Sequence, residues 1–334
     1  GPRGGQSLPP MGPCRADCAM KFRDRWECGV DVAAQQSLDT ERIQAGVIKV
    51  ADWSKTWTWH NGKWSEGNPP LMGPRSHAFW LGSVVFDGAR AFEGVTPDLD
   101  LHCARINKSA EAMGLRALHS DGKVLEIAKE GVAKFAKDAQ LYIRPMYWAE
   151  EGGYYSVPPA PESTQFCMCI YEAPMGPPQG FSVTQSTFRR PTAQMAPVNA
   201  KAACLYPNSA RALMEAKEKG FDNALVLDAL GNVAELATAN VFLAKDGVAH
   251  TPAPNGTFLN GITRQRVIQL LRDAGIQVVE RALTYQDFLD ADEIFSSGNY
   301  SKVVPVNRID DRDLQPGPIA KKARELYWEY AHRG

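Results

Sequence analysis

Apolar positions repeat with two different periods along the first half of the chain, and each period predicts a kind of element. The β-type residues and the Asn-Gly pair of 56–64 are typical of a hairpin with a two-residue turn. Apolar residues at helical spacing predict helices over 102–118 and 124–136, whereas more continuous apolar runs predict buried strands at 140–148 and 164–171. Strands and helices therefore alternate in this half.

The second half continues the alternation after a run of turn-forming residues. Asn208 or Ser209 is placed to cap a helix that runs to about residue 219, and Thr263 is expected to begin another that ends before Gly275. Short apolar runs rich in β-forming residues predict strands at 181–188, 224–228 and 241–244. The whole chain is predicted to be α+β.

The boundaries between the parts of the chain follow from where periodicity stops. Residues before about 50 mix glycine, proline, cysteine and charge, and the opening Gly-Pro resembles the remnant of a cleaved tag. Residues 173–180 are rich in proline and glycine, as an interdomain linker would be. We therefore expect a flexible extension at 1–50, a small domain at 51–174, a linker at 175–182 and a large domain at 183–334.

Composition narrows the classes of partner. The chain has 334 residues, 44% of them hydrophobic, and a formal net charge of −1, so no overall field attracts nucleic acid or an anionic membrane. No apolar run reaches the length of a membrane helix, and we expect a cytoplasmic protein with a small-molecule ligand. The 7 cysteines are odd in number and lack CxxC spacing, which argues against a disulfide framework and against a zinc site.

A glycine turn before a helix is the first candidate for ligand binding. Leu259-Asn260-Gly261-Ile262-Thr263-Arg264 precedes apolar positions at helical spacing. The start of such a helix presents free backbone N–H groups and the positive end of the helix dipole, which suits a phosphate. Capping of the helix by Thr263 is the plain structural alternative.

Two ionisable residues lie in unusually apolar surroundings. Lys201 stands in Pro197-Val198-Asn199-Ala200-Lys201-Ala202-Ala203, so its ammonium should be partly desolvated, which favours the nucleophilic amine. Glu235 stands in Val233-Ala234-Glu235-Leu236-Ala237 and needs a cation or a hydrogen-bond donor if it is buried. The alternatives are a solvated surface lysine and a carboxylate on the open face of a strand.

These motifs resemble one family in order and spacing. Lys201 with Tyr206, then Glu235, Asn240 and the glycine turn are similar to the C-terminal half of branched-chain aminotransferases and their fold-type IV relatives. The resemblance covers nearly everything after about residue 55, including 82–90, 102–106, 142–145, 291–298, 305–306 and 317–322. It implies an α+β fold of the D-amino-acid and branched-chain aminotransferase type, with a small α/β N-terminal domain and a larger α/β-barrel-like C-terminal domain.

The resemblance implies a cofactor, pyridoxal 5′-phosphate, bound to Lys201 as a Schiff base. Lys201 would then move the proton between the substrate α-carbon and the cofactor, while Glu235 would keep the pyridine nitrogen protonated and Tyr206 would bind the 3′-oxygen. The remaining cofactor-binding residues implied by the family are Arg105, Ile262, Thr263 and Asn299. Arg105 could instead be an ordinary charge on the surface of a helix.

Substrate contacts follow from the same resemblance. The implied residues are Phe86, Gly88, Arg90, Tyr142, Arg144 and Tyr300. Arg144 is the strongest of them on physical grounds, because an arginine in an apolar strand needs an anionic partner. Two departures from the family pattern are Ala239, where a second acid is usual, and Gly298-Asn299-Tyr300, where Gly-Thr-Ala is usual. The bulk of Tyr300 is expected to narrow or reshape the pocket.

The implied activity is ping-pong transamination between an apolar amino acid, branched-chain or other, and a 2-oxo acid. Within the fold, amine:pyruvate and D-amino-acid transaminases are alternatives. A lyase resembling aminodeoxychorismate lyase is an alternative of another reaction class, and a binding module without activity is a third. The family builds its site at a subunit interface, so we expect a homodimer or an oligomer of dimers, without nucleic-acid or membrane partners.

Overall fold

The structure is a computed structural model that describes residues 52–333. The extension predicted at 1–50, with Cys14, Cys18 and Cys28, lies outside the described residues. The cysteines at 103, 167, 169 and 204 are free thiols. No helix among residues 52–333 has the length and apolar character needed to cross a membrane.

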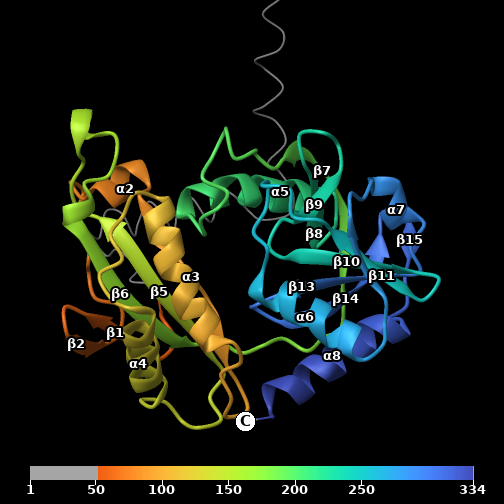
Figure 1. Ribbon diagram of the computed structural model, residues 1–334, viewed down its shortest axis with the longest axis horizontal. Coiled ribbons are helices and arrows are strands. Elements are labelled where there is room, and N and C mark those ends of the chain that lie inside the picture. Colours follow the sequence, from red (N-terminus) through yellow and green to blue (C-terminus); the bar gives the residue numbers. More distant parts are fainter. Residues whose placement is uncertain (1–51, 334) are drawn as a thin grey trace, which may run out of the picture. The chain divides into compact units, whose positions relative to one another are not determined.

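The first part of the described chain forms a six-stranded antiparallel sheet (Figure 1). Its strands are β1 (Thr56–His60), β2 (Lys63–Glu66), β3 (Val84–Phe86), β4 (Ala89–Ala91), β5 (Leu141–Ala149) and β6 (Thr164–Glu172). The order is β2-β1-β6-β5-β3, and β4 also pairs with β5. The predicted hairpin is confirmed, since Asn61 and Gly62 both have positive φ, 49° and 79°, as a two-residue turn between twisted strands requires.

Helices pack against this sheet and build its core. They are α2 (His77–Leu81), α3 (Leu99–Ala112) and α4 (Asp121–Val132), and the short 3₁₀ turns are Tyr154–Ser156 and Pro161–Ser163. Ile106 of α3 and Ile127 of α4 are wholly buried in one cluster with Ile143 of β5. The prediction that the first helix reaches residue 118 is wrong, because the chain leaves the helix at Gly114, where φ is 71°.

The second sheet has nine strands and mixed directions. They are β7 (Phe181–Arg189), β8 (Asn223–Leu227), β9 (Val233–Leu236), β10 (Asn240–Lys245), β11 (Val248–Pro252), β12 (Val278–Arg281), β13 (Glu293–Gly298), β14 (Lys302–Ile309) and β15 (Arg312–Asp313). The order is β12-β11-β10-β13-β14-β7-β8-β9, with β15 beside β14. Strand β9 also contacts β10, so the sheet curls upon itself. The strands predicted in this half are confirmed.

The helices of this half cover the curled sheet (Figure 1). They are α5 (Tyr206–Glu218), α6 (Ile262–Asp273), α7 (Tyr285–Leu289) and α8 (Pro318–Ala331), with a 3₁₀ turn at Ala203–Leu205. Helix α5 lies against β7 and β8, whereas α6 and α8 lie against β13 and β14.

The predicted cap of α5 is wrong, whereas a helix does begin about Thr263, although Thr263 does not cap it. Helix α5 begins before Asn208 and Ser209, because Pro207 fits the first turn, where no N–H is needed. The Asn208 amide donates instead to the Arg189 carbonyl. Gly261 caps α6 with extended backbone, so Thr263 is the second residue of that helix and its hydroxyl does not cap it.

Candidate active site

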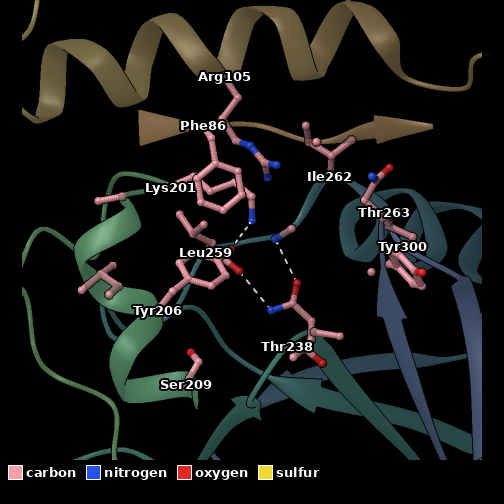
Figure 2. Close-up of a pocket in the computed structure, with 18 of the residues that line it drawn as sticks. Phe86, Arg105, Lys201, Tyr206, Ser209, Thr238, Leu259, Ile262, Thr263 and Tyr300 are labelled. Carbon is pink, nitrogen blue, oxygen red and sulfur yellow. Dashed lines mark hydrogen bonds between the residues drawn. The ribbon is translucent and has the colours of Figure 1, made fainter. Parts of the chain in front are cut away.

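A cavity of about 560 Å³ is lined by residues from both sheets. Figure 2 shows Lys201 pointing into it between Phe86 and Tyr206, with Arg105 descending from α3 and the start of α6 on another side. All of the site residues expected from the sequence line this cavity except Arg90: Phe86, Gly88, Arg105, Tyr142, Arg144, Lys201, Tyr206, Glu235, Ile262, Thr263, Asn299 and Tyr300.

The backbone of Lys201 is fixed from two sides. Its carbonyl accepts a hydrogen bond from Phe86 N at 3.1 Å, and its N–H donates to Ser109 Oγ on α3 at 3.1 Å. Ala202 next to it forms a bridge with Val85 of β3 and is wholly buried. The apolar flanks noted in the sequence therefore anchor this segment on the core of the first sheet.

The Lys201 side chain reaches into the cavity and contacts the phenol of Tyr206. Its Nζ donates to Tyr206 Oη at 2.7 Å and lies 4.9 Å from the centre of the Phe86 ring. The rings of Phe86 and Tyr206 are 5.0 Å apart, so the amine has aromatic surface on two sides. This setting holds the amine against aromatic surface and orients it for attack on a carbonyl carbon.

Glu235 of β9 also lines the cavity, with only 14% of its side chain exposed. The Arg190 guanidinium lies 3.2 Å from its Oε1, and Asn240 Nδ2 lies 3.5 Å from its Oε2. Burial raises the pKa of Glu235 to about 7, although the charges of Arg190 and Lys201 oppose the rise. A further cation beside Glu235 would therefore stabilise its charged form.

Arg190 is a site residue that the sequence did not reveal. A buried Glu235 needs a cation or a hydrogen-bond donor, but no local pattern pointed to one 45 positions earlier. Arg190 is itself buried, and its Nε also donates to the Thr257 carbonyl at 3.0 Å. The available signal was a charged residue directly after the predicted strand at 181–188, next to Arg189.

The start of α6 forms one wall of the cavity. Asn240 fixes the preceding turn, because its Oδ1 accepts from Gly261 N at 3.2 Å and its Nδ2 donates to the Leu259 carbonyl at 3.0 Å (Figure 2). A Cβ on Gly261 would lie 2.2 Å from that Oδ1, so this approach requires glycine. The first-turn N–H groups from Ile262 onward have no acceptor within the helix and can bind an anion.

Besides Arg144 Nε, three buried polar atoms of residues that line the cavity have no hydrogen-bond partner among the described residues. They are His102 Nε2, Ser297 Oγ and Asn299 Nδ2. Buried polar atoms are seldom left without partners, so such a group indicates a missing ligand. Together with the start of α6 and Arg105, these atoms form a polar wall with several hydrogen-bond donors, which fits a phosphate.

Arg105 is held by a carboxylate that the sequence analysis overlooked. Asp87 is wholly buried and accepts from Arg105 Nε at 2.6 Å and Arg105 NH2 at 2.8 Å, while His102 Nδ1 lies 2.7 Å away. Burial alone would raise the pKa of Asp87, but the charges of Arg105 and His102 outweigh it and hold that pKa well below its ordinary value. Asp87 therefore stays ionised and fixes both side chains, which argues against the surface alternative for Arg105.

Tyr142 and Arg144 line another part of the cavity. The rings of Tyr142 and Tyr171 stack at 5.5 Å, and the Arg144 guanidinium lies 5.0 Å from each ring centre while it donates to Tyr171 Oη. Arg144 forms no ion pair within residues 52–333, so its charge is available to an anion. A Cβ on Gly88 would lie 2.1 Å from Tyr142 Oη, so glycine is what lets this tyrosine enter.

Arg90 lies outside the cavity, behind one of its walls. Its Nε donates to the Tyr300 carbonyl at 3.0 Å, its NH1 donates to the Ala173 carbonyl, and its guanidinium lies 4.6 Å from the Tyr300 ring. The side chain is wholly buried. Arg90 therefore contacts Tyr300, which lines the cavity, but does not line the cavity itself.

Known proteins match this chain over most of its length. A model of the family described as Amino-transferase class IV matches residues 84–309. The chain belongs to the class IV aminotransferases. A probable branched-chain-amino-acid aminotransferase of Rickettsia bellii is 31% identical over 254 residues, which are 76% of this chain and 87% of that protein.

Solved structures agree with this assignment. An aminotransferase from Brucella abortus, bound to the co-factor PLP, is 59% identical with a TM-score of 0.82, and the match covers 83% of this chain and 99% of that one. A branched-chain aminotransferase from Thermoproteus uzoniensis, solved with norvaline, is 30% identical with a TM-score of 0.76. The match covers 83% of this chain and 95% of that one.

The family membership confirms several sequence predictions for this aminotransferase. The fold-type IV architecture is confirmed, and so is the activity of an aminotransferase. Class IV aminotransferases use pyridoxal 5′-phosphate, so the predicted cofactor is confirmed as well. The lyase and binding-module alternatives are not favoured.

Proposed function

We propose that this aminotransferase moves an amino group between an apolar amino acid, branched-chain or other, and a 2-oxo acid by a ping-pong mechanism. The observation that carries the proposal is the joint presence, in one cavity, of the Lys201 amine on Tyr206, the buried Glu235 and the open start of α6. The names of its relatives support the substrate class, since the Rickettsia bellii protein is described as a probable branched-chain-amino-acid aminotransferase.

The residues divide between the two ends of the cofactor. Glu235 would hold a protonated ring nitrogen, and its raised pKa supports this role because a nearby cation repays the cost of burying the carboxylate. Arg105 and the first-turn N–H groups at Ile262 and Thr263 would hold the phosphate, with Asn299 beside them. Bound pyridoxal phosphate supplies an aldehyde for the amino group and a ring that withdraws electrons from the substrate α-carbon.

Lys201 and Tyr206 would carry out the proton chemistry. The Lys201 amine would take a proton from the substrate α-carbon, deliver it to the cofactor carbon that receives the amino group, and carry one back in the second half-reaction. Tyr206 Oη, 2.7 Å from Lys201 Nζ, would hold that amine in place and bind the 3′-oxygen. The surrounding Phe86 surface would exclude water from the proton that is moved.

The substrate side suits an apolar side chain and one carboxylate. Phe86 and Tyr206 offer aromatic walls, while Tyr142 and Arg144 offer a phenol and a charge without a carboxylate partner. Tyr300 bounds this side and replaces the small residue usual in the family. These groups would bind a 2-oxo acid in the second half-reaction through the same carboxylate contacts.

We further propose a homodimer, or an oligomer of dimers, in the cytoplasm. Large apolar side chains of α2 and of the neighbouring 3₁₀ turn are more than half exposed, which is unusual for a free surface: Phe79, Trp80, Tyr154, Tyr155 and Val157. The small-domain loop that reaches over a partner's pocket in this family offers a use for such a surface. Light scattering that gave a monomer at micromolar concentration would contradict this proposal.

The proposed domain division uses the break between the sheets. Strand β6 ends at Glu172 and β7 begins at Phe181, and the residues between them belong to neither sheet. This break supports the division between a small domain over 51–174 and a large domain over 183–334, and the proposed linker at 175–182 falls in it except for Phe181 and Ser182, which already belong to β7.

The test of the function is spectroscopic. The holoenzyme should show the visible band of lysine-linked cofactor, and Lys201→Ala should lose both band and activity, whereas Lys217→Ala at an exposed position of α5 should keep both. Adding an amino donor without an acceptor should leave the pyridoxamine form. A colourless reconstituted wild type would reject the proposal, and release of pyruvate without a pyridoxamine form would favour elimination.

A screen of amino donors in the same half-reaction tests the substrate class. Apolar L-amino acids should bleach the band at lower concentration than D-amino acids or amines without a carboxylate. A preference for simple amines would favour the amine:pyruvate alternative, and a preference for D-enantiomers would favour the D-amino-acid alternative.

A further inference from the structure

A buried lysine lies directly behind the cavity wall. Lys302, the first residue of β14, is only 1% exposed, and its Nζ donates to Asn299 Oδ1 at 2.9 Å. Its ammonium also lies 5.5 Å from the centre of the Tyr327 ring. Within residues 52–333 it takes part in no ion pair. A buried cation with so little compensation is costly, so its presence needs a reason.

The backbone at Lys302 is also unusual. Gly298 and Lys302 are paired across β13 and β14, and the three residues between them form the turn that carries Asn299 and Tyr300. Lys302 has φ of 62°, a left-handed conformation that glycine adopts at less cost. A lysine in this conformation indicates that its side chain has a role that glycine could not fill.

The contact with Lys302 sets the direction of the Asn299 amide. An ammonium can only donate, so the amide atom that faces Lys302 Nζ is the oxygen, and the NH₂ group must point elsewhere. That Nδ2 atom is buried and has no partner in the described part of the chain, and Asn299 lines the cavity. The amide therefore has a free donor and a fixed orientation.

The turn stands beside the anion-binding start of α6. Ser297 is paired with Asn240 between β13 and β10, and Asn240 in turn binds Gly261 N at the start of the helix. Ser297 Oγ is a further buried atom without a partner on the same wall. The Asn299 donor and the start of α6 therefore border the same region of the cavity.

We propose that Lys302 is a positioning residue, which holds the Asn299 carboxamide so that Nδ2 donates to an anionic oxygen in the cavity. The proposal rests on the proposed function, and the oxygen belongs either to the cofactor phosphate or to the substrate carboxylate. Burial lowers the pKa of Lys302 to about 7, and the charge of Arg90 adds to this while Asp98 opposes it, so an anion nearby also favours the charged lysine.

The experiment compares Lys302→Met, Asn299→Ala and the double variant with the wild-type holoenzyme. Cofactor retention is measured by dilution and back-titration, competition by inorganic phosphate is measured on the same samples, and KM is measured for amino donor and 2-oxo acid. Lys302→Met should weaken the binding of one anion by about tenfold, the usual effect of a charge-assisted hydrogen bond. Lys321→Met at an exposed position of α8 is the matched control.

Two further readouts separate positioning from a structural role. Because Lys302 acts through Asn299, the double variant should lose no more than Asn299→Ala alone. Because methionine removes a buried charge, the melting temperature of Lys302→Met should stay the same or rise while anion binding falls. A variant damaged only in its structure would lose melting temperature as well.

The outcomes identify the anion or overturn the proposal. Weaker retention of pyridoxal phosphate, with unchanged binding of pyridoxal, assigns the donor to the phosphate; a raised KM alone assigns it to the substrate carboxylate. Wild-type retention and KM in Lys302→Met, or losses that add in the double variant, would overturn it. If Lys302→Met does not fold, unchanged anion binding in Asn299→Ala overturns it equally. A wild type without the visible band would instead reject the proposed function itself.

Discussion

The substitution Glu235→Gln isolates the cost of keeping a carboxylate in the cavity. In the folded protein the pKa of Glu235 is raised to about 7 from an ordinary value of 4.5, chiefly by burial. The side chain is only 14% exposed, so little of this shift is screened by solvent. A difference of 2.5 units, at 1.36 kcal/mol for each unit, amounts to about 3 kcal/mol.

The sign of the pH effect follows from which state holds the proton. Between pH 4.5 and about 7 the folded protein keeps the Glu235 proton that the unfolded chain has released. The free energy of unfolding therefore falls as pH rises through this window. Glutamine does not titrate, so the stability of Glu235→Gln relative to wild type should rise by about 3 kcal/mol across the window. In Glu235→Gln, Arg190 has lost its carboxylate partner. This loss changes the free energy of unfolding of the variant by an amount that does not depend on pH.

The assay is urea unfolding of cofactor-free protein at several pH values from 4.5 to 8.5. Glu218→Gln, at an exposed position of α5, is the control and should run parallel to wild type. With cofactor present, Glu235→Gln should lose most of its activity because a neutral amide cannot hold a protonated ring nitrogen. Parallel stability curves for Glu235→Gln and wild type would refute the reasoning, because they would mean that Glu235 titrates alike in both states.

Two further substitutions test the walls of the cavity. Asp87→Asn should lower the free energy of unfolding by about 3 kcal/mol, because it leaves the partly buried Arg105 and the buried His102 without their carboxylate; a loss below about 1 kcal/mol by urea unfolding would show that Asp87 does not hold them. Gly88→Ala should raise KM for amino acids about tenfold, since its Cβ would lie 2.1 Å from Tyr142 Oη and displace that ring. An unchanged KM would mean that the Tyr142 hydroxyl does not contact substrate.

Local sequence predicted the features whose causes are local. Lys201 and Glu235 were recognisable because each interrupts an apolar run, and the Gly261 turn because a glycine precedes helical spacing. The strands of both sheets were placed well for the same reason. The errors at helix ends are also local, since Gly114 and Pro207 decide them more strongly than apolar spacing does.

The partners of these residues could not be predicted, because they come from distant segments. Arg190, directly after β7, meets Glu235 of β9 across the single strand β8, and Asp87, between β3 and β4, meets Arg105 of helix α3. Apolar spacing says nothing about which charges a fold brings together. The place of Arg90 behind Tyr300 likewise depends on how the two sheets meet, which no single run of residues encodes.

The bonds of Arg90 tie the connection between the sheets to the rim of the pocket. One guanidinium holds the carbonyl of Ala173, where that connection begins, and the carbonyl of Tyr300, which limits the space for a substrate side chain. A rotation of one sheet against the other would therefore pull on Tyr300 through a stiff and wholly buried linkage. Any such movement would therefore change the space that Tyr300 leaves for a substrate side chain.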